Sequence, residues 1–401
     1  MNILFVNDIP FNPIAGGLER VTDVLTKEMV KRGYTIYYLY GKLPESKLYL
    51  LDYAFPATLY QLPCVGMFDN EENLAFYEQL QSDLKIDIVV NQRGLGGCYN
   101  SILPRTHTKL ISVIHSTPEG AMRVYLSKII ECSAPPFRKL KRLLKGLLFP
   151  FVSAYWESRC IEERKAAYNQ LAKYSDVIVT LSAKYNSIMN KYLDVPQKAT
   201  LVSIPNPNTF RVSGSFNEFK GKNILYVGRL EKVDKNPIRI LKIWKDLHCK
   251  YPDWQLKIVG EGTEKVKMQE YVKLHSLNNV HFEGQQSDVS QYYREASFVC
   301  LTSNFEGWGM ALTEGMQFGC IPFTFNNYGA AYEIIDDGIN GCLISAYNLK
   351  EYGSRLSELM SDDDMRSKMS MAAIEKVKMF SVENVVDKWE EIFNSLYVKF
   401  D

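Results

Sequence analysis

The feature that most constrains the fold is the alternation of short apolar runs with segments of helical periodicity along nearly the whole chain. The first run, Ile3–Val6, is followed by a Gly-Gly loop and by the helical segment Leu18–Arg32, which Gly33 can close. The runs are continuous rather than alternating, which is typical of strands buried on both faces. Repeated strand–helix units of this kind predict an α/β fold built on parallel sheets.

The apolar runs form two series. The later runs of the first series are Ile86–Asn91, Leu110–His115, Val177–Leu181 and Thr200–Ile204. The second series comprises Ile224–Val227, Gln255–Val259, Val280–Phe282, Phe298–Leu301, Ile321–Phe325 and Gly341–Ile344. Two prolines in the stretch Ile204–Asn208 make a stiff, non-helical connection between the series. A chain of 401 residues is long for one hydrophobic core, so we predict two domains, residues 1–205 and 206–381.

The last helical segment runs from Val382 to Leu396 and carries a broad apolar stripe that needs a partner surface. It can pack on its own C-terminal domain. Alternatively, residues 382–401 can cross back to cap the N-terminal domain. The sequence leaves both arrangements open.

The overall composition excludes several classes of protein. The net charge is +1, with 47 basic and 46 acidic residues, so nothing favours nucleic acid as a partner. None of the eight cysteines forms a C-x-x-C pair or a zinc-like spacing with histidine, which favours reduced, buried thiols. The N-terminal apolar run has only four residues, too few for a signal peptide, and no segment is suited to span a membrane. We therefore expect a cytoplasmic protein.

The sharpest motif lies between the apolar run Phe298–Leu301 and the helical segment that follows it. Glu306 and Glu314 stand eight positions apart and flank Gly307 and Gly309. Eight helical steps cover roughly 12 Å, a suitable span for two carboxylates that hold hydroxyls at opposite ends of a sugar-diphosphate-ribose ligand. The helix start offers N–H groups and a positive dipole end to phosphates. The alternative is that these are ordinary surface residues at a strand–helix turn.

A second motif, residues 228–235, directly follows the run Ile224–Val227. In open α/β sheets, ligands bind beyond the carboxyl ends of strands, where Arg229 and Lys235 would project. A guanidinium and an ammonium can hold a diphosphate and stabilise it as it leaves. The alternative is a solvated charged loop, because acidic residues lie between the two cations.

With these motifs, the chain resembles the retaining glycosyltransferases of group 1, a GT4-like family with two facing Rossmann-like domains and a deep interdomain cleft (the GT-B architecture). The resemblance covers most of the C-terminal half and is thinner in the N-terminal half. Five C-terminal segments carry it in order: residues 227–230, 258–262, 280–284, 306–314 and 338–341. In the N-terminal half, residues 16–20, His115, 176–179 and 204–206 carry it.

The resemblance implies a role for each matched residue. Arg229 and Lys235 would bind the donor diphosphate, Glu306 the hydroxyls of the transferred sugar, and Glu314 the ribose hydroxyls. The further donor-binding positions in this half are Gly228, Gly260, Gly284, Gly307, Gly309 and Met310.

Two residues of the C-terminal half depart from the family pattern. Trp308 stands where the family usually has Phe, and Asn236 stands where it usually has Gly. Asn tolerates left-handed backbone geometry, so we expect the turn after Lys235 to survive.

Two features of the N-terminal half gain meaning from the resemblance. Gly16 and Gly17 precede a helix, where glycine permits close approach of a ligand and the helix start favours an anion. The alternative is a flexible turn, but the resemblance implies a cleft-lining loop near the donor or acceptor. His115 ends a predicted strand and would be the family's cleft histidine, which contacts the donor sugar. It need not act as a general base.

Two local segments bear on membrane and metal binding. Residues 137–149 are basic and amphipathic, which suits either peripheral membrane contact or an ordinary helix with a solvated basic face. Asp362-Asp363-Asp364 contains a D-x-D pattern, but capping of the helical segment after it explains the acids better. We predict no catalytic metal and no cofactor.

These observations together predict a metal-independent, hexosyltransferase-type glycosyltransferase. It would move a sugar from a nucleoside-diphosphate sugar, such as a UDP-sugar, to a hydroxyl of a glycan or lipid-linked acceptor, with retention. The resemblance favours cell-surface polysaccharide or glycolipid synthesis. The alternatives are an epimerase or phosphorylase on the same architecture and a non-catalytic nucleotide-sugar binding protein. An oxidoreductase is disfavoured because no G-x-G-x-x-G follows a first strand.

Overall fold

The computed structural model describes residues 1–68, 70–94, 108–119, 161–194, 198–210 and 220–397. The chain divides into two compact units. The first contains residues 1–9, 35–46 and 57–203, and the second contains residues 10–34, 47–56 and 204–401. The segment after the first strand therefore belongs to the second unit, together with the C-terminal half of the chain.

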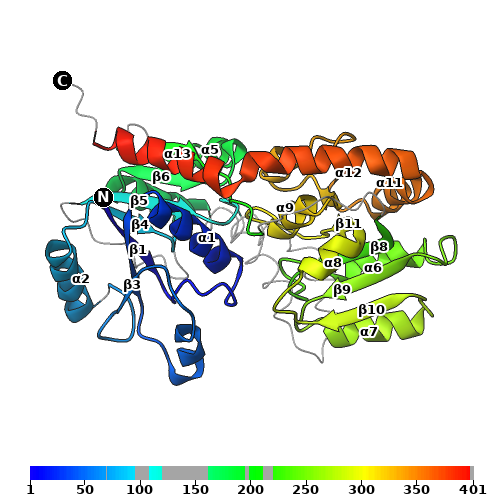
Figure 1. The fold of residues 1–401 in the computed structure, drawn as a ribbon, viewed down its shortest axis with the longest axis horizontal. Helices are drawn as coiled ribbons and strands as arrows, with labels where there is room; N and C mark the ends of the chain where they lie inside the picture. The colour runs from blue at the N-terminus through cyan, green and yellow to red at the C-terminus, as the bar shows by residue number, and fades with distance from the viewer. Residues whose placement is uncertain (69, 95–107, 120–160, 195–197, 211–219, 398–401) are drawn as a thin grey trace, which may run out of the picture. The chain divides into compact units, whose positions relative to one another are not determined.

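The first unit is built on a seven-stranded parallel sheet with the order β3-β2-β1-β4-β5-β6-β7 (Figure 1). Its strands are β1 (Asn2–Asn7), β2 (Thr35–Tyr40), β3 (Thr58–Gln61), β4 (Ile88–Asn91), β5 (Lys109–Ile114), β6 (Val177–Thr180) and β7 (Thr200–Ser203). The helices α2 (Glu71–Asp83) and α5 (Ala183–Met189) belong to this unit, and residues 161–174 are also helical.

The second unit is built on a six-stranded parallel sheet with the order β10-β9-β8-β11-β12-β13. Its strands are β8 (Gly221–Val227), β9 (Gln255–Val259), β10 (Val280–Gly284), β11 (Ala296–Cys300), β12 (Ile321–Phe325) and β13 (Cys342–Ile344). The predicted α/β class with parallel sheets is confirmed. The run of buried residues along β11 and β12 explains why their sequences are continuously apolar.

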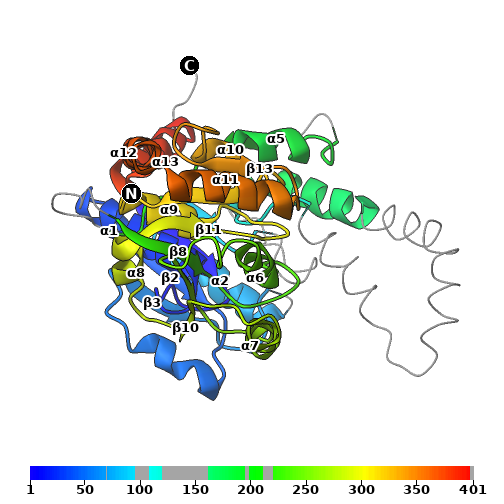
Figure 2. The same ribbon diagram turned by 90° about the vertical axis from the view of Figure 1, so that its right-hand side faces the viewer.

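The helices of the second unit follow the strands in sequence, as the strand–helix alternation predicts. They are α1 (Gly17–Lys31), α6 (Ile238–Lys245), α7 (Lys265–Leu274), α8 (Ser290–Glu295), α9 (Met310–Gln317), α10 (Ala331–Ile334), α11 (Leu349–Ser361), α12 (Asp363–Val377) and α13 (Val382–Ser395). Two short 3-10 helices, Glu45–Leu51 and Lys378–Phe380, complete the described elements. Helices α11 and α12 follow one another along one side of this unit (Figure 2).

Each sheet carries its own hydrophobic core. In the second unit, one large cluster joins residues of the strands to apolar faces of α6, α7 and α11. Trp254 stacks on Phe298 within it, with ring centroids 5.4 Å apart. In the first unit, separate clusters form under α2 and under the helix of residues 161–174. The apolar runs seen in the sequence are therefore the sheet interiors.

Both sheets have a point at which the strand order reverses. Strand β1 lies between β2 and β4, and β8 lies between β9 and β11. At such a point the connections on either side leave toward opposite faces of the sheet, which opens a crevice at the carboxyl ends of the strands. In the second unit, this places the loops after β8 and β11 next to each other.

The last helix meets an element from the N-terminal half of the sequence. Helix α13 packs against α1, and Tyr34 just after α1 contacts Phe393 with ring centroids 5.7 Å apart. Arg32 donates to Asp387 at 2.6 Å and to Glu390 at 2.8 Å. An apolar stripe and a pair of acids on α13 thus find their partners about 350 residues earlier in the chain.

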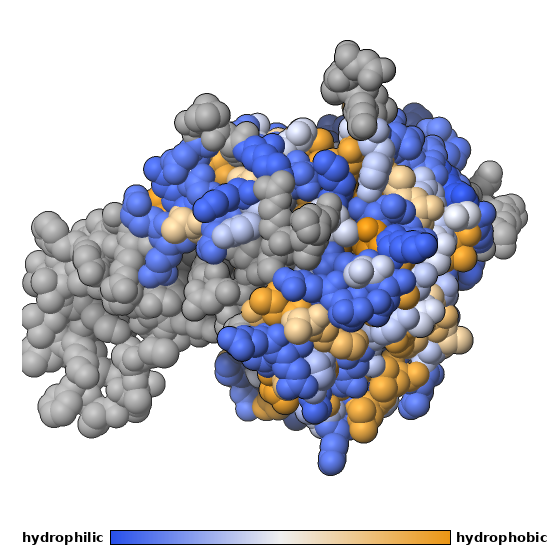
Figure 3. All heavy atoms as spheres, turned by 90° about the vertical axis from the view of Figure 1, so that its left-hand side faces the viewer, coloured by the Kyte–Doolittle hydropathy of each residue, from blue (hydrophilic) through white to orange (hydrophobic). Residues whose placement is uncertain are grey.

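The surface and the thiols are ordinary for a globular protein. Hydrophobic residues are interspersed with hydrophilic ones on the face drawn in Figure 3. Cys300, Cys320 and Cys342 are buried free thiols, as predicted, whereas Cys249 is exposed. Burial raises the pKa of Cys300 to about 12, so this thiol stays protonated. Throughout the part of the chain that the structure describes, every helix is too short or too polar to cross a membrane.

Candidate functional site

The loops that follow β8 and β11 are joined by one residue, Asn304. Its backbone N–H donates to the carbonyl of Asp234 at 2.7 Å, and its side-chain amide donates to the carbonyl of Val233 at 2.9 Å. Asn327 holds the other side of the same loop, because its amide donates to the Asn304 carbonyl at 2.8 Å. The two motifs found in the sequence are therefore fixed side by side at the switch point of the second sheet.

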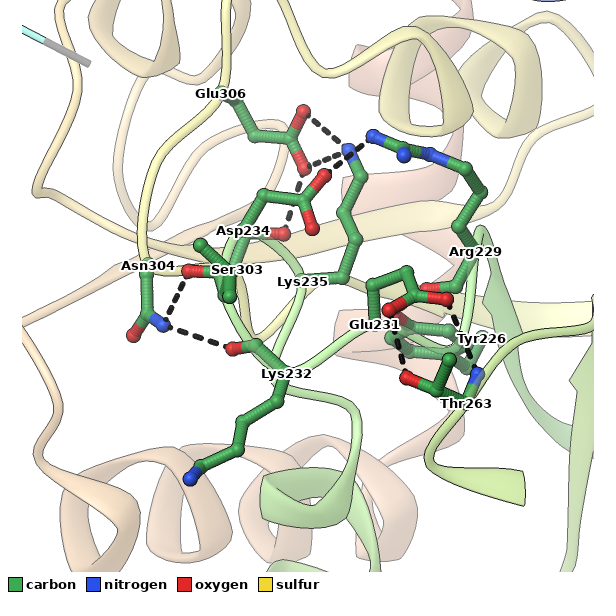
Figure 4. Close-up of polar contacts among 11 residues, drawn as sticks. Tyr226, Arg229, Glu231, Lys232, Asp234, Lys235, Thr263, Ser303, Asn304 and Glu306 are labelled. Atoms are coloured by element: carbon green, nitrogen blue, oxygen red, sulfur yellow. Dashed lines mark hydrogen bonds and ion pairs between the residues drawn. The ribbon is translucent and has the colours of Figure 1, made fainter. Parts of the chain in front are cut away.

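Lys235 and Glu306, one from each motif, form the centre of this arrangement (Figure 4). The Lys235 ammonium donates to both carboxylate oxygens of Glu306, at 2.6 and 2.7 Å. Ser303 donates a third hydrogen bond, at 2.6 Å, to the same carboxylate. The side chains of Lys235 and Glu306 are only 20% and 7% exposed, so this is a largely desolvated ion pair. Such a pair is geometrically well defined because both charges are largely removed from bulk water.

Arg229 forms a second, more exposed ion pair in the same place. Its Nη2 donates to Asp234 Oδ2 at 2.5 Å, and its side chain is 71% exposed (Figure 4). Most of the guanidinium donors therefore remain available to solvent or to a ligand. Glu231 is turned away from this pair and accepts from Thr263, at 2.7 Å from its hydroxyl and at 3.1 Å from its backbone N–H.

A buried tyrosine lies beneath the two ion pairs. Tyr226 has no exposed surface, and its hydroxyl donates to the Arg229 carbonyl at 3.4 Å. Burial, followed by the nearby carboxylates of Glu306 and Asp234, raises the pKa of Tyr226 well above its ordinary value. The phenol is thus neutral and serves as a support for the loop.

The two departures from the family pattern are accommodated. Asn236 has φ of 44°, so the predicted left-handed turn after Lys235 is confirmed. Trp308 is buried, and its ring packs edge-on against Phe380 at 5.1 Å. The larger indole therefore packs against the 3-10 helix Lys378–Phe380 that precedes α13.

The glycines of the motif regions have identifiable backbone reasons. Gly309 has φ of 94° and is the N-cap residue just before α9, while Gly307 lies half-buried two residues earlier. A Cβ on Gly260 would lie 2.0 Å from the Gly228 carbonyl oxygen, so these two strand ends touch through their backbones. Gly284 also has a positive φ, of 70°. Their expected donor contacts remain predictions.

Glu314 belongs to a polar cluster separate from that of Glu306. Its Oε1 accepts from Arg20 Nη1 at 2.7 Å and from the Thr209 hydroxyl at 2.9 Å. Its Oε2 accepts from the Tyr293 hydroxyl at 3.0 Å. Tyr293 is fully buried and stacks on Phe318, and its burial raises its pKa well above the ordinary value, so the phenol remains a hydrogen-bond donor.

The beginning of α1 lies beside the beginning of α9. A Cβ added to Gly17 would lie 3.6 Å from Met310 Cγ, and one added to Gly16 would lie 2.8 Å from Glu19 Oε2. Gly16, Gly17 and Met310, three residues predicted to bind the donor, are therefore gathered in one unit. Two helix N-termini with positive dipole ends meet here, which favours a ligand that carries negative charge.

His115 lies in the first unit, at the carboxyl end of β5. Its Nε2 is hydrogen-bonded to the Gln92 side chain, which follows β4, whereas its Nδ1 is buried without a partner among the described residues. Burial lowers the pKa of His115 to about 3, so the imidazole is neutral at physiological pH. With Nε2 donating to the Gln92 carbonyl oxygen, Nδ1 can accept a hydrogen bond from a hydroxyl but carries no charge.

The structure thus brings the predicted residues into three groups. Arg229, Lys235 and Glu306 form one group, Glu314 lies near α1, and His115 lies at the carboxyl end of β5 in the first unit. Sequence reasoning missed the residues that hold them, chiefly Ser303, Asn304, Thr209 and Tyr293, and it left Arg20 without a role. Ser303 and Asn304 could have been suspected from their place in the same strand–helix loop. Tyr293 carries no signal in the sequence.

The remaining motif predictions have simple outcomes. Asp362 caps α12, because its side chain accepts from the Met365 N–H at 2.8 Å, as predicted for the D-x-D pattern. No cluster of three His, Cys, Asp or Glu side chains suited to hold a metal ion is found among the described residues. The amphipathic segment 137–149 lies outside the described residues.

Comparison with known proteins agrees with this geometry. Residues 211–376 match the family model described as "Glycosyl transferases group 1". An uncharacterised glycosyltransferase of Haemophilus influenzae is 30% identical over 218 residues, which cover 54% of this chain and 61% of that protein. The amylovoran biosynthesis glycosyltransferase AmsD of Erwinia amylovora is 29% identical over 292 residues, which cover 70% of this chain and 79% of that protein.

A solved structure supports the fold over nearly the whole length. A variant of TarM from S. aureus, in complex with fondaparinux, alpha-GlcNAc-glycerol and UDP, superposes with a TM-score of 0.71 at 13% identity, and the match covers 98% of this chain and 99% of that one. At this identity the likeness establishes the two-domain fold alone. Residues 211–376 thus carry the match to the group 1 glycosyl transferases, and together with the two relatives the comparisons support a glycosyltransferase related to that family.

Proposed function

We propose that this protein transfers a sugar from a nucleoside-diphosphate sugar to an acceptor hydroxyl, with retention of the anomeric configuration and without a catalytic metal. The observation that carries the proposal is the desolvated Lys235–Glu306 pair beside Arg229, at the switch point of the second sheet. The two cations would bind the diphosphate, and the adjacent carboxylate would accept hydrogen bonds from the sugar hydroxyls.

Each charged group has a task in this proposal. Lys235 carries three N–H donors, so it can keep one hydrogen bond to Glu306 and give others to a phosphate. Arg229 presents its exposed donors to the same diphosphate. Negative charge develops on the leaving phosphate during transfer, and these two cations with the N-terminus of α9 would stabilise it. Glu306, held by Ser303 and Lys235, would accept hydrogen bonds from the sugar hydroxyls.

The remaining steps follow from retention. Positive charge develops at the anomeric carbon as the bond to phosphate breaks, and the acceptor oxygen attacks from the same face. The departing phosphate would take the acceptor's proton. His115, neutral and with a buried Nδ1, would accept a hydrogen bond from a donor-sugar hydroxyl and need not move a proton.

For the substrates, the relatives guide the proposal. AmsD is named for amylovoran biosynthesis, and the TarM structure contains UDP. We therefore propose a UDP-sugar donor and a glycan or lipid-linked acceptor of a cell-surface polysaccharide or glycolipid. The protein would act in the cytoplasm, with residues 137–149 as the segment that could reach the membrane surface.

The first test is thermal stabilisation by UDP, GDP and ADP and their common sugars, with and without EDTA. A nucleotide present at 100 times its Kd stabilises the folded state by about 2.7 kcal/mol, which shifts the melting temperature by several degrees. We expect one nucleoside diphosphate to do so equally with EDTA. Loss of the shift in EDTA would refute the metal-free site.

The second test uses the sugar identified in the first, with radiolabelled donor and candidate acceptors. We expect Glu306→Gln to lose transfer by at least about a hundredfold while still binding the nucleotide, since it alters a contact to the reacting sugar. The matched control is Glu375→Gln, an exposed carboxylate on α12. Near-normal transfer by Glu306→Gln would overturn the assignment of Glu306 to the sugar hydroxyls. Nucleotide binding by the wild type without turnover of any acceptor would show a nucleotide-sugar binding protein instead of an enzyme. NMR of the product would determine whether the anomeric configuration is retained.

A further inference from the structure

Glu314 holds an unusually complete set of donors for a residue proposed to bind a substrate. Arg20 and Thr209 donate to Oε1, and Tyr293 donates to Oε2. The Glu314 side chain is 5% exposed, so few waters can exchange into this arrangement. The carboxylate is therefore already satisfied by the protein.

A count of acceptor sites shows the consequence. An ionised carboxylate offers about four acceptor positions, two on each oxygen. Three are occupied here, which leaves one on Oε2. When both hydroxyls of a ribose donate to one carboxylate, each of them needs an acceptor position. Three donors and two hydroxyls exceed four positions, so one protein donor must leave when ribose binds.

The donors differ in how readily they can leave. Tyr293 is fully buried, and release would strand its hydroxyl without a partner. Thr209 has a short side chain, so its hydroxyl can move only by rotation about a single side-chain bond. Arg20 reaches Glu314 through a single nitrogen at the end of a long side chain that is already 34% exposed. Once released, the Arg20 guanidinium can be hydrated at the surface, whereas the buried Tyr293 hydroxyl cannot.

There is space for the released side chain. Arg20 and Thr209 both line a pocket of about 1510 Å³, whose wall also includes Phe210 and the loop residues Gln285 and Gln286 that follow β10. The pocket begins at the partners of Glu314 and continues along α1, where Lys31 also lines it. Arg20 can thus swing away from Glu314 without leaving this hollow.

We propose that Arg20 competes with the donor ribose for Glu314, so that nucleotide binding releases the guanidinium from the carboxylate. This inference rests on the proposed function, because it takes Glu314 as the ribose-binding residue. It makes Arg20 a determinant of how strongly the protein recognises a ribose. Substrate binding would also be coupled to α1, because the ion pair between α1 and α9 breaks as the nucleotide enters.

The experiment compares two nucleotides that differ only in the hydroxyls. Isothermal titration gives the Kd of UDP and of 2′,3′-dideoxy-UDP for wild type, Arg20→Met and Arg20→Gln. If GDP or ADP is the better ligand in the thermal screen, its dideoxy form replaces the uridine pair. The ratio of the dideoxy Kd to the ribose Kd measures what the hydroxyls contribute, and the charge of the diphosphate cancels in it.

We expect this ratio to rise at least about fivefold in both Arg20 variants, because the hydroxyls no longer displace a charge-assisted hydrogen bond. The matched control is Lys31→Met. Lys31 lines the same pocket, but its ammonium pairs with Glu28 instead of Glu314. Its ratio should equal that of wild type. Two different substitutions of Arg20 are used so that the test does not fail if one variant misfolds.

The outcomes separate the inference from the proposed function. A Kd ratio that falls in the Arg20 variants would show that Arg20 orients Glu314 for the ribose, and a constant ratio would show that Arg20 has no effect on ribose binding. Either result would overturn the inference. A wild-type ratio near one, with normal nucleotide binding, would overturn it too and leave the transferase proposal intact. Absence of binding by UDP, GDP and ADP to the wild type would refute the proposed function, and the inference would fall with it.

Discussion

The Lys235–Glu306 pair makes a strong prediction about stability. In Lys235→Met the Glu306 carboxylate remains buried at 7% exposure but loses both hydrogen bonds that the Lys235 ammonium donates to it. The Ser303 hydroxyl still donates to this carboxylate. A methionine fills nearly the same volume as the lysine stem, so the change isolates the charge from the packing.

The magnitude follows from the environment of the pair. Removal of one partner of a fully buried ion pair destabilises a protein by roughly 3–5 kcal/mol. Here Lys235 is 20% exposed and Ser303 still donates, so we expect a loss of about 2–3 kcal/mol in the free energy of unfolding. In Glu306→Gln the lysine can turn to solvent, and we expect only about 1 kcal/mol. The double variant should be no less stable than Lys235→Met, because no uncompensated charge remains.

Urea unfolding followed by tryptophan fluorescence suits this measurement. Four of the five tryptophans, at positions 244, 254, 308 and 389, lie in the second unit, which also contains the ion pair. Lys267→Met, an exposed lysine on α7, is the matched control. If Lys235→Met lost less than about 1 kcal/mol, or if the double variant lost the sum of the single losses, the description of a desolvated, coupled pair would be wrong.

Three further predictions concern single residues. The pKa of His115 in the folded protein, about 3, lies below its ordinary value of 6.5, so the unfolded chain takes up the proton first as pH falls. Wild type should therefore lose stability relative to His115→Gln between pH 6.5 and pH 3, by at most about 1.4 kcal/mol per pH unit. Parallel pH profiles of thermal unfolding for the two proteins would contradict this. Tyr293→Phe deprives Glu314 Oε2 of its donor, so we expect a loss of about 1–3 kcal/mol in the free energy of unfolding measured in urea, and an unchanged free energy would contradict a stabilising hydrogen bond. Asn236→Gly should be nearly neutral at φ of 44°, whereas Asn236→Ala should destabilise by about 1–2 kcal/mol; equal melting temperatures of these two variants would argue against the left-handed turn.

Much of the fold could be predicted because burial leaves a local trace in the sequence. Strands covered on both faces are mainly apolar, so the buried strands β4, β6, β11 and β12 appear in the sequence as continuous apolar runs. The edge strand β3 is only partly buried, and its sequence Thr58–Gln61 carries a weaker signal. The left-handed turn at Asn236 was also predictable, because backbone sterics act within a single residue.

The candidate site was predictable in its chemistry but not in its pairings. The positions of Arg229, Lys235 and Glu306 after strands follow from the rule that ligands bind at the carboxyl ends of parallel strands. Lys235 forms an ion pair with Glu306, 71 residues away, because the strand order makes β8 and β11 neighbours. Strand order is a property of the packed sheet, and no local pattern encodes it.

The sequence by itself determined most of the strands, the left-handed turn at Asn236 and the residue types at the strand ends, because these depend on burial and backbone sterics within a few residues. Only the tertiary structure decided which charges meet. Arg20 reaches Glu314 across 294 positions, and α13 returns to α1, because packing joins surfaces that have complementary shape and charge irrespective of their separation along the chain. The energy of a buried charge depends on its neighbours in space, so the function of such residues becomes visible only once the chain is folded.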